Sequence, residues 1–244
     1  MEHWESLKVG GYRFVYDDGL FRPGTDTFLL SSLPRLKAGL RVCDLGCGTG
    51  LLGLLLMQRQ DGLSVTGVDI QPEAINLASR CAEENGLTEH LRFLHADLRA
   101  VQSHFLTGSF DLVVCNPPYY PPQSGRMSED AAIRTARSEI SCTLEDICYA
   151  ASYLLRWGGS FCLVHKPERL TDVLDAMRRH GCEPKRLRLV STRPESAPSL
   201  LLVEGRRGGK PGLSIEAPLI LQTSNGNPTP EVETIYFRQQ EDTP

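Results

Sequence analysis

Hydrophobic and polar positions divide the chain into short apolar runs and longer amphipathic stretches. Seven runs rich in Val, Leu, Ile and Cys have the length and composition of buried strands: 41–45, 63–70, 91–95, 110–115, 160–165, 187–190 and 200–204. Stretches with apolar residues at helical spacing lie between them, at 50–60, 72–85, 143–155 and 167–180. This alternation predicts an α/β fold in which the last two strands are antiparallel partners.

Two further segments flank this core. Tyr12–Tyr16 alternates between apolar and polar side chains, and the turn sequence after it leads to Leu20-Phe21, which predicts a small hairpin. A helix start follows, for which Thr25 or Asp26 is a candidate cap. Beyond Gly208-Gly209 the chain is rich in Pro, Asn and Thr, which predicts a partly irregular extension. The predicted parts are an N-terminal segment, a core and a C-terminal extension: 1–39, 40–206 and 207–244.

Composition excludes several classes of protein. Hydrophobic residues make up 41% of the chain and charged residues 23%, as in ordinary globular domains. No apolar run approaches the roughly 18 residues of a membrane span, and the start of the chain does not resemble a signal peptide. We therefore expect a cytoplasmic protein with no membrane partner. The eight cysteines include no C-x-x-C pair and the histidines have no metal-binding spacing, so we expect buried free thiols and no metal site.

The net charge of −4 conceals a basic block. Residues 151–210 carry 12 basic and 6 acidic side chains, whereas the segments on either side are acidic. Such a block suits a polyanion, and Lys185 and Arg186 at its centre are candidate contacts. The alternative is a solvated surface with ordinary ion pairing, because aromatic residues do not interleave with these charges.

The candidate chemistry lies in Asn116-Pro117-Pro118-Tyr119, directly after the strand at 110–115. Ligands of open α/β sheets bind beyond the carboxyl ends of the strands. The prolines restrict the backbone and remove N–H donors, so this turn offers acceptors to a group that is itself a donor, such as an –NH2. Tyr119 supplies a flat face for a planar target. The alternative is that Asn-Pro-Pro is only a rigid turn.

Other polar residues follow the neighbouring predicted strands. Asp44 and the glycines 46, 48 and 50 end the first strand, and glycines there allow close approach of a ligand. Asp69 ends the second strand, where a carboxylate can bind the two hydroxyls of a ribose. Asp97 follows the third strand, and taken alone it is a helix cap. His165 and Lys166 end the fifth strand and should emerge beside Asn116.

This order of strand-end residues resembles the class I S-adenosylmethionine-dependent methyltransferases. The G-x-G-x-G spacing after Asp44 resembles their first motif, and Asn116–Tyr119 resembles the catalytic motif of the amino-methyltransferases, which methylate adenine or glutamine nitrogen. The resemblance implies a Rossmann-like fold with a seven-stranded, mostly parallel sheet, helices on both faces, and S-adenosylmethionine as cofactor. It implies these cofactor-binding residues: Thr25, Asp26, Asp44, Gly46, Gly48, Gly50, Asp69, Ile70, Asp97, Leu98 and Asn116.

Three segments narrow the resemblance: 116–119, 136–146 and 165–170 are similar to the bacterial tRNA adenine-N6 methyltransferases that modify the adenosine beside the anticodon of a valine tRNA. Ser138 and Arg22-Pro23 depart from that family's pattern. The resemblance implies a tRNA partner, catalytic roles for Asn116, Pro117 and Tyr119, and substrate contacts from Tyr119, His165 and Lys166.

Two alternatives remain open. The first is glutamine methylation of a release factor, although only about forty residues precede the first core strand, too few for the helical substrate domain of that family. The second is a catalytically silent S-adenosylmethionine-binding partner subunit, which would have no need of an intact Asn116 and Tyr119.

Overall fold

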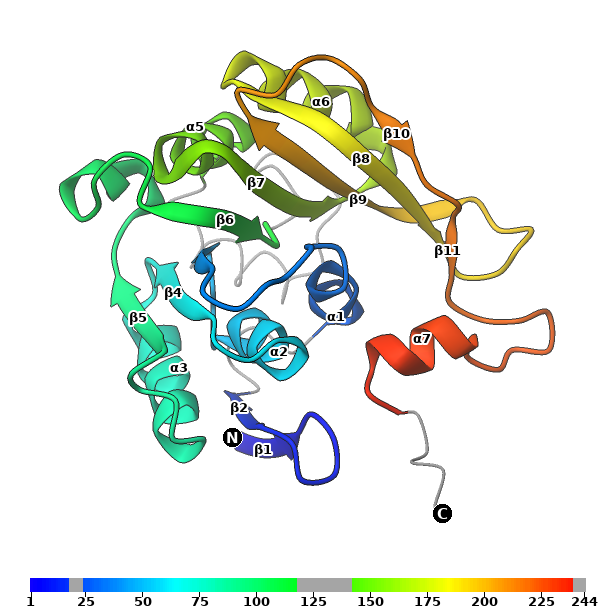
Figure 1. The fold of residues 1–244 in the computed structure, drawn as a ribbon. Coiled ribbons are helices and arrows are strands. Elements are labelled where there is room, and N and C mark those ends of the chain that lie inside the picture. The colour runs from blue at the N-terminus through cyan, green and yellow to red at the C-terminus, as the bar shows by residue number, and fades with distance from the viewer. Residues whose placement is uncertain (18–23, 118–141, 239–244) are drawn as a thin grey trace.

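A computed structural model describes residues 1–17, 24–117 and 142–238 of the chain. Its centre is a sheet of seven strands in the order β8-β9-β7-β6-β3-β4-β5 (Figure 1). The seven strands are β3 (Arg41–Leu45), β4 (Ser64–Asp69), β5 (Leu91–His95), β6 (Phe110–Cys115), β7 (Leu155–His165), β8 (Cys182–Ser191) and β9 (Pro198–Arg207). Only β9 runs antiparallel to its neighbours, β7 and β8. The predicted mostly parallel sheet with these seven strands is confirmed, and two short strands of the C-terminal extension bring the whole sheet to nine strands.

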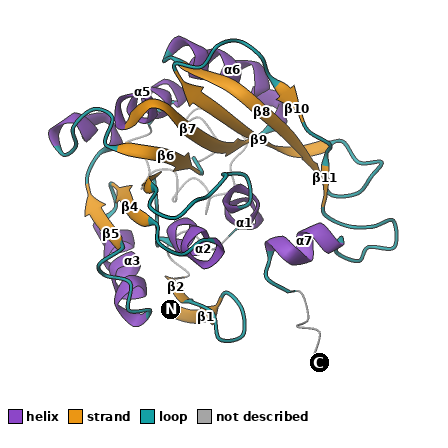
Figure 2. Cartoon of the chain, viewed as in Figure 1, coloured by secondary structure: helices purple, strands orange, loops and turns teal. Residues whose placement is uncertain are grey.

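Helices cover both faces of this sheet (Figure 2). On one face lie α1 (Thr25–Ser31), α2 (Leu51–Arg59) and α3 (Pro72–Glu84), and on the other lie α5 (Leu144–Leu154), α6 (Leu170–Arg179) and the short 3₁₀ helix η1 (Leu98–Ser103). A second 3₁₀ helix, η2 (Pro167–Arg169), leads into α6.

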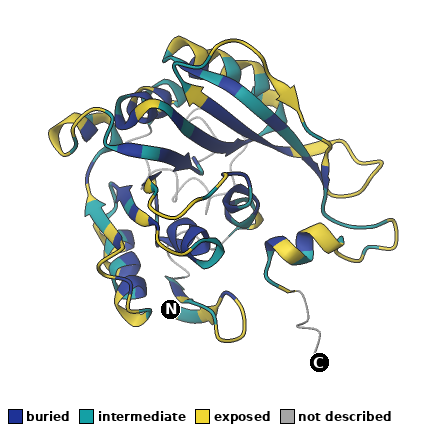
Figure 3. Ribbon diagram, in the orientation of Figure 1, coloured by how far each residue is buried: buried dark blue, intermediate teal, exposed yellow. Residues whose placement is uncertain are grey.

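Each strand therefore supplies two hydrophobic cores. Val42 and Val114 pack with α1, α2 and α3, whereas their chain neighbours Cys43 and Val113 pack with α5. Alternate side chains of a strand point to opposite faces, and both faces are buried here, which is why these strands are apolar throughout. Figure 3 shows the central strands almost wholly buried. All eight cysteines are free and seven of them are buried, as predicted.

The N-terminal hairpin forms with a different partner from the predicted one. β2 (Arg13–Asp17) pairs antiparallel with β1 (Glu2–Ser6), whereas Leu20-Phe21 lies outside the described residues. β1 has the sequence Glu-His-Trp-Glu-Ser, whose weak apolar pattern gave no strand prediction. The hairpin docks on α3, where Arg80 forms a bidentate ion pair with Glu2 and the Val15 N–H lies 3.2 Å from the Cys81 sulfur.

The C-terminal extension is more regular than predicted. Two short strands, β10 (Ser214–Ile215) and β11 (Leu219–Ile220), pair in parallel with the edge strand β8. The helix α7 (Pro230–Ile235) then buries Val232 and Ile235 in the same core as α1 and α2. The described part of the extension is thus packed against the rest of the molecule, and α7 lies beside α1 (Figure 1). Among the described residues, no helix is both long and apolar enough to cross a bilayer.

Candidate active site

The predicted site residues meet at one edge of the sheet, around the point where the strand order reverses. From β3 the chain moves outward through β4 and β5, and it then returns to place β6 on the other side of β3. Leu45 at the end of β3 is in register with Val68 of β4 and with Cys115 of β6. Such a switch point leaves a crevice beyond the strand ends that binds ligands in open α/β sheets. The glycine-rich loop follows β3 there, Asp69 ends β4 there, and Asn116 follows β6 there.

The glycines of the loop divide into two roles. Gly46 and Gly48 have φ values of +71° and +52°, and a Cβ at either position would meet no atom within 4 Å. The side of each glycine where a Cβ would lie therefore faces open space, as a loop that closely approaches a ligand requires. Gly50 caps α2 with φ +80°, and a Cβ there would lie 2.5 Å from the Phe93 ring. Gly50 therefore allows the helix to pack closely on β5.

Asp69 fastens this loop. Its Oδ2 accepts a hydrogen bond from the Gly48 N–H at 2.8 Å, and its Oδ1 accepts one from the Gln71 N–H at 2.9 Å. Burial raises the pKa of the Asp69 carboxyl, and these backbone hydrogen bonds oppose that rise. A carboxylate has about four acceptor positions, so Asp69 retains acceptor capacity for ligand hydroxyls beside its structural bonds.

Asp44 carries an unsatisfied buried acceptor. The residue is 1% exposed, and its Oδ2 has no hydrogen-bond partner among the described residues. Burial and the neighbouring Asp69 charge raise the pKa of Asp44 to about 8. Buried polar atoms are nearly always hydrogen-bonded, so this oxygen indicates a ligand that brings a donor. The ammonium group of S-adenosylmethionine is such a donor. The Asp44 acceptor and the open glycine loop together fit this cofactor.

The structure shows a different use for the Asp97 side chain. Asp97 caps η1 by accepting from the Arg99 N–H at 2.8 Å, and it forms an ion pair with the Arg99 guanidinium at 2.6 Å. The hydrogen bond from Arg99 lowers the pKa of Asp97. The helix-cap alternative is therefore what the structure shows, and contact of Asp97 and Leu98 with the adenine stays a prediction. The predicted cofactor residue Ile70 is fixed by a 2.9 Å hydrogen bond between its carbonyl oxygen and His95 Nε2.

Asn116 is held by a residue that the sequence did not indicate. Its Nδ2 donates to Thr27 Oγ1 at 3.0 Å, across 89 positions of the chain. Thr27 lies on α1 and is 6% exposed. The expected cap of α1 by Thr25 or Asp26 is wrong, because Gly24 is the N-cap and no side chain caps the helix. The contact of Thr25 and Asp26 with the cofactor stays a prediction.

His165 ends β7, the strand that pairs with β6, and its expected position next to the Asn116 side chain stays a prediction. Cys115 of β6 is in register with Leu163 of β7, which aligns Pro117 with His165. Burial lowers the pKa of His165 to about 4, so the imidazole is neutral at physiological pH. Its Nδ1 accepts from the Lys166 N–H at 2.8 Å, which places the ring proton on Nε2. Pro117 is buried, whereas Tyr119 lies outside the described residues.

Arg186 lies on β8, away from this site, and its contact with RNA, like that of Lys185, stays a prediction. β9 and β7 separate its strand, β8, from β6. The Arg186 guanidinium pairs with Glu204 at 2.5 Å and Glu216 at 2.7 Å, and it also donates to the Leu33 carbonyl oxygen. Lys185 Nζ donates to the Lys210 carbonyl oxygen. These side chains tie the extension to the sheet.

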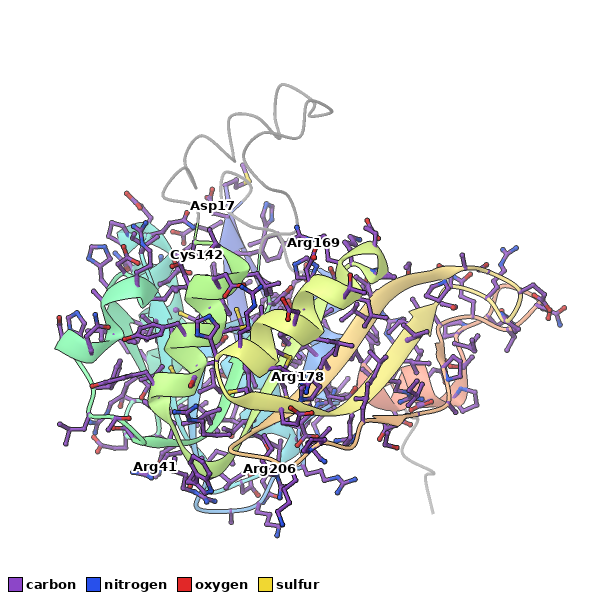
Figure 4. The ribbon with its side chains drawn as sticks, turned by 90° about the horizontal axis from the view of Figure 1, so that it is seen from above. Asp17, Arg41, Cys142, Arg169, Arg178 and Arg206 are labelled. Atoms are coloured by element: carbon purple, nitrogen blue, oxygen red, sulfur yellow. The ribbon has the colours of Figure 1, made fainter. Side chains whose placement is uncertain are left out.

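Half of the twelve basic residues of the block form ion pairs with described residues, Arg186 and Arg156 among them. Arg169 pairs with Asp172, Arg178 with Glu183, Arg179 with Glu145 and Asp175, and Arg188 with Glu231. The block also does not form a single face: Arg169 lies at the same end of the molecule as Cys142, whereas Arg206 lies at the opposite end, as Arg41 does (Figure 4). The ion-pairing alternative therefore describes half of these charges. No cluster of His, Cys, Asp or Glu among the described residues is suited to a metal ion.

Comparison with known proteins agrees with this site. The model of the methyltransferase small domain family matches residues 15–177. The tRNA1(Val) (adenine(37)-N6)-methyltransferase of Dickeya chrysanthemi is 30% identical over 216 residues, which cover 86% of this chain and 84% of that protein. The enzyme of the same name from Yersinia enterocolitica is 32% identical over 164 residues, covering 65% of this chain and 64% of that protein.

A release factor glutamine methyltransferase from Chlorobaculum tepidum is also similar. It is 33% identical over 168 residues, covering 62% of this chain and 57% of that protein. The chain thus spans less than two thirds of the Yersinia and Chlorobaculum relatives, and more than four fifths of the Dickeya relative.

Solved structures show the same fold. A predicted O-methyltransferase from Agrobacterium tumefaciens superposes with a TM-score of 0.72 at 24% identity, covering 88% of this chain and 96% of that one. A geranyl diphosphate methyltransferase in complex with S-adenosylmethionine superposes with a TM-score of 0.55 at 20% identity, covering 74% and 83%. With the family match to residues 15–177 and the fit of the strand-end residues to the cofactor, the chain belongs to the methyltransferase small domain family of S-adenosylmethionine-dependent methyltransferases.

Proposed function

We propose that the protein transfers a methyl group from S-adenosylmethionine to the exocyclic N6 amine of an adenosine in tRNA, the adenosine beside the anticodon of a valine tRNA. The observation that carries the proposal is the Asn116 amide, which lies at the carboxyl end of β6 next to the cofactor loop and is fixed by Thr27. Relatives whose names state this activity support it at 30 to 32% identity.

The residues present suit an amine acceptor. The lone pair of an aromatic amine is delocalised, so two acceptors that hold its hydrogens favour a pyramidal nitrogen that can attack. Asn116 Oδ1 and the Pro117 carbonyl oxygen are these acceptors. The cofactor, when bound, supplies the electrophilic methyl group on its sulfonium. The target base has to leave its stack to reach the strand end, and Tyr119 is the proposed stacking partner.

His165 suits a role at the edge of this pocket. Its neutral imidazole adds no positive charge beside a nitrogen that becomes positive as the methyl group arrives. Because Nδ1 accepts from the Lys166 N–H, His165 contributes Nε2–H as a donor to the acceptor nitrogens of a base or to the RNA backbone. Lys166 is the proposed phosphate contact beside it.

One experiment separates this activity from the alternatives. The protein is incubated with methyl-labelled S-adenosylmethionine and, in parallel, with total tRNA or with a purified bacterial release factor, and the products are digested and identified by mass spectrometry. The Asn116→Ala variant is the control for adventitious methylation. We expect N6-methyladenosine in valine tRNA. Label in a glutamine of the release factor would favour the activity named for the Chlorobaculum relative, and no label in either acceptor would favour the silent partner subunit.

A further inference from the structure

The helix α1 lies between the Asn116 amide and the segment 229–238 near the C-terminus. It is only seven residues long and has no side-chain cap, and helices this short depend on tertiary contacts for their stability. Thr27 on α1 holds Asn116. Whatever fixes α1 therefore also fixes the amide that the proposed reaction uses.

The C-terminal segment 229–238 makes those contacts. The Tyr236 ring stacks on Phe28 of α1 with ring centroids 4.6 Å apart and an angle of 8° between the planes. The Tyr236 hydroxyl also hydrogen-bonds with Thr25, which opposes the rise that burial causes in the pKa of Tyr236. Aromatic stacking adds stabilisation beyond the apolar area that it buries. The first half of α1 is thus joined to the end of the chain.

Arg59 of α2 joins the other end of α1 to the same segment. Its Nε donates to Ser31 Oγ at 3.0 Å, its Nη2 donates to the Ile235 carbonyl oxygen at 2.6 Å, and its guanidinium lies 4.7 Å from the centre of the Phe237 ring. Burial lowers the pKa of Arg59 to about 10, and no carboxylate among the described residues opposes that shift. A buried guanidinium is costly unless its hydrogen bonds are satisfied, so these contacts form a built connection.

The segment is itself anchored far from the site. Thr229 caps α7, and Glu231 pairs with Arg188 of the edge strand β8. Phe237 has φ +58°, the left-handed conformation that non-glycine residues seldom adopt. Such a conformation persists where its surroundings determine it, and here the guanidinium of Arg59 lies over its ring.

We propose that the segment 229–238 positions the Asn116 amide through α1 and Thr27, so that Thr27 and Tyr236 are positioning residues for methyl transfer. The proposal rests on the proposed function of Asn116. Tyr236 touches α1 and not the amide, so it acts at one remove. Loss of the contacts between this segment and α1 would leave the cofactor loop after β3 unchanged, because Asp69 holds that loop through the Gly48 N–H.

A double-mutant cycle on the full chain tests this inference. We expect Thr27→Val to lower kcat about fivefold to tenfold, the scale of one lost hydrogen bond, with little change in KM for tRNA and in cofactor affinity by calorimetry. Thr27→Ser keeps the hydroxyl and should restore most of kcat. Tyr236→Ala should lower kcat by a similar factor, and in the Thr27→Val background it should have little further effect. Additive losses would contradict the path through Thr27.

A readout without substrate separates this inference from the proposed function. Hydrogen exchange of the amides in α1 should rise in Tyr236→Ala, while exchange in α3 stays unchanged. Tyr153→Ala removes a half-buried tyrosine on the other face of the sheet and should leave α1 unchanged. Unaltered exchange of α1 in Tyr236→Ala would overturn the inference. Failure of the wild-type protein to methylate any acceptor, with faster exchange in α1, would instead overturn the proposed function alone.

Discussion

The loops after β3, β4 and β6 contrast with β8 and the extension paired to it in how they use charged and polar side chains. At the strand ends, Asp44 has a buried oxygen without a partner among the described residues, and a Cβ at Gly46 or Gly48 would meet no atom within 4 Å. On β8, Arg186 and Arg188 form ion pairs with carboxylates of the C-terminal extension. The first region is arranged for a ligand, and the second is satisfied internally.

This contrast shows which sequence patterns specify a site. Residues that end parallel strands converge because the topology brings every carboxyl end to one edge, so their order along the chain suffices to place them. A run of basic residues carries no such constraint. Its partners come from positions as distant as Glu216 and Glu231, and a count of charges does not reveal them.

Removal of the Asn116 amide should have the largest effect at the strand ends. An interaction that strengthens in the transition state lowers kcat without much change in binding. We expect Asn116→Ala to lose about a hundredfold or more in single-turnover rate, the scale of a lost transition-state contact, while it binds cofactor and tRNA nearly normally. A near-wild-type rate of tRNA methylation would remove Asn116 from the catalytic role.

Asp69→Ala should have the next largest effect, on the cofactor. Asp69 is predicted to bind the ribose hydroxyls and also holds the Gly48 N–H, so its loss removes a ligand contact and loosens the loop. We expect S-adenosylmethionine affinity to fall by about 1.5 to 3 kcal/mol, the scale of hydrogen bonds to a charged group. Isothermal titration calorimetry measures this change, with circular dichroism as the control for folding. An unchanged affinity in a folded variant would leave Asp69 with the structural role alone.

Sequence reasoning located the sheet and the strand ends because both depend on local patterns. The apolar runs specified β3 to β9 in order, and the antiparallel pairing of β8 and β9 was predicted. It missed Thr27, whose hydrogen bond to Asn116 spans 89 positions, because no pattern links the two segments. It also missed β1, whose polar composition hides a strand that is stabilised by docking on α3.

The pH dependence of stability should expose the unpartnered acid at Asp44. Its folded pKa is raised to about 8 from an unfolded value of about 4, so the native state binds the proton more tightly. The stabilisation is fully present below pH of about 4 and is lost as the pH rises towards 8. We therefore expect the free protein to lose stability over this range through this group, and Asp44→Asn to flatten the profile. Thermal unfolding at several pH values measures both.

Cofactor binding should reverse this penalty. An ammonium group next to Asp44 favours the carboxylate, so binding at pH 7 should release a proton. Calorimetry in buffers of different ionisation enthalpy detects that release, and Asp44→Asn is the control that should abolish it. A binding enthalpy that does not depend on the buffer would show that Asp44 is already ionised in the free protein.

The smallest expected effect is on RNA binding, and it concerns the exposed arginines that form no ion pair with the C-terminal extension. Arg193 is exposed and follows β8, which runs parallel to β7 because both are antiparallel to β9. Arg193 therefore lies at the edge of the sheet where the parallel strands end, as His165 does. Arg206 is also exposed, but it lies near the end of β9, which runs antiparallel to β7, and this places it towards the opposite edge from His165.

These two arginines form a matched pair for RNA binding. If tRNA approaches the strand ends, Arg193→Ala should reduce the slope of log K against log salt by about 0.7 to 0.9, the contribution of one phosphate contact, whereas Arg206→Ala should leave the slope unchanged. Filter binding of a valine tRNA transcript at several salt concentrations measures both. Equal slopes for the two variants and the wild type would mean that neither exposed arginine meets a phosphate. A change for Arg206→Ala alone would place the RNA at the opposite edge and contradict catalysis by Asn116 on that RNA.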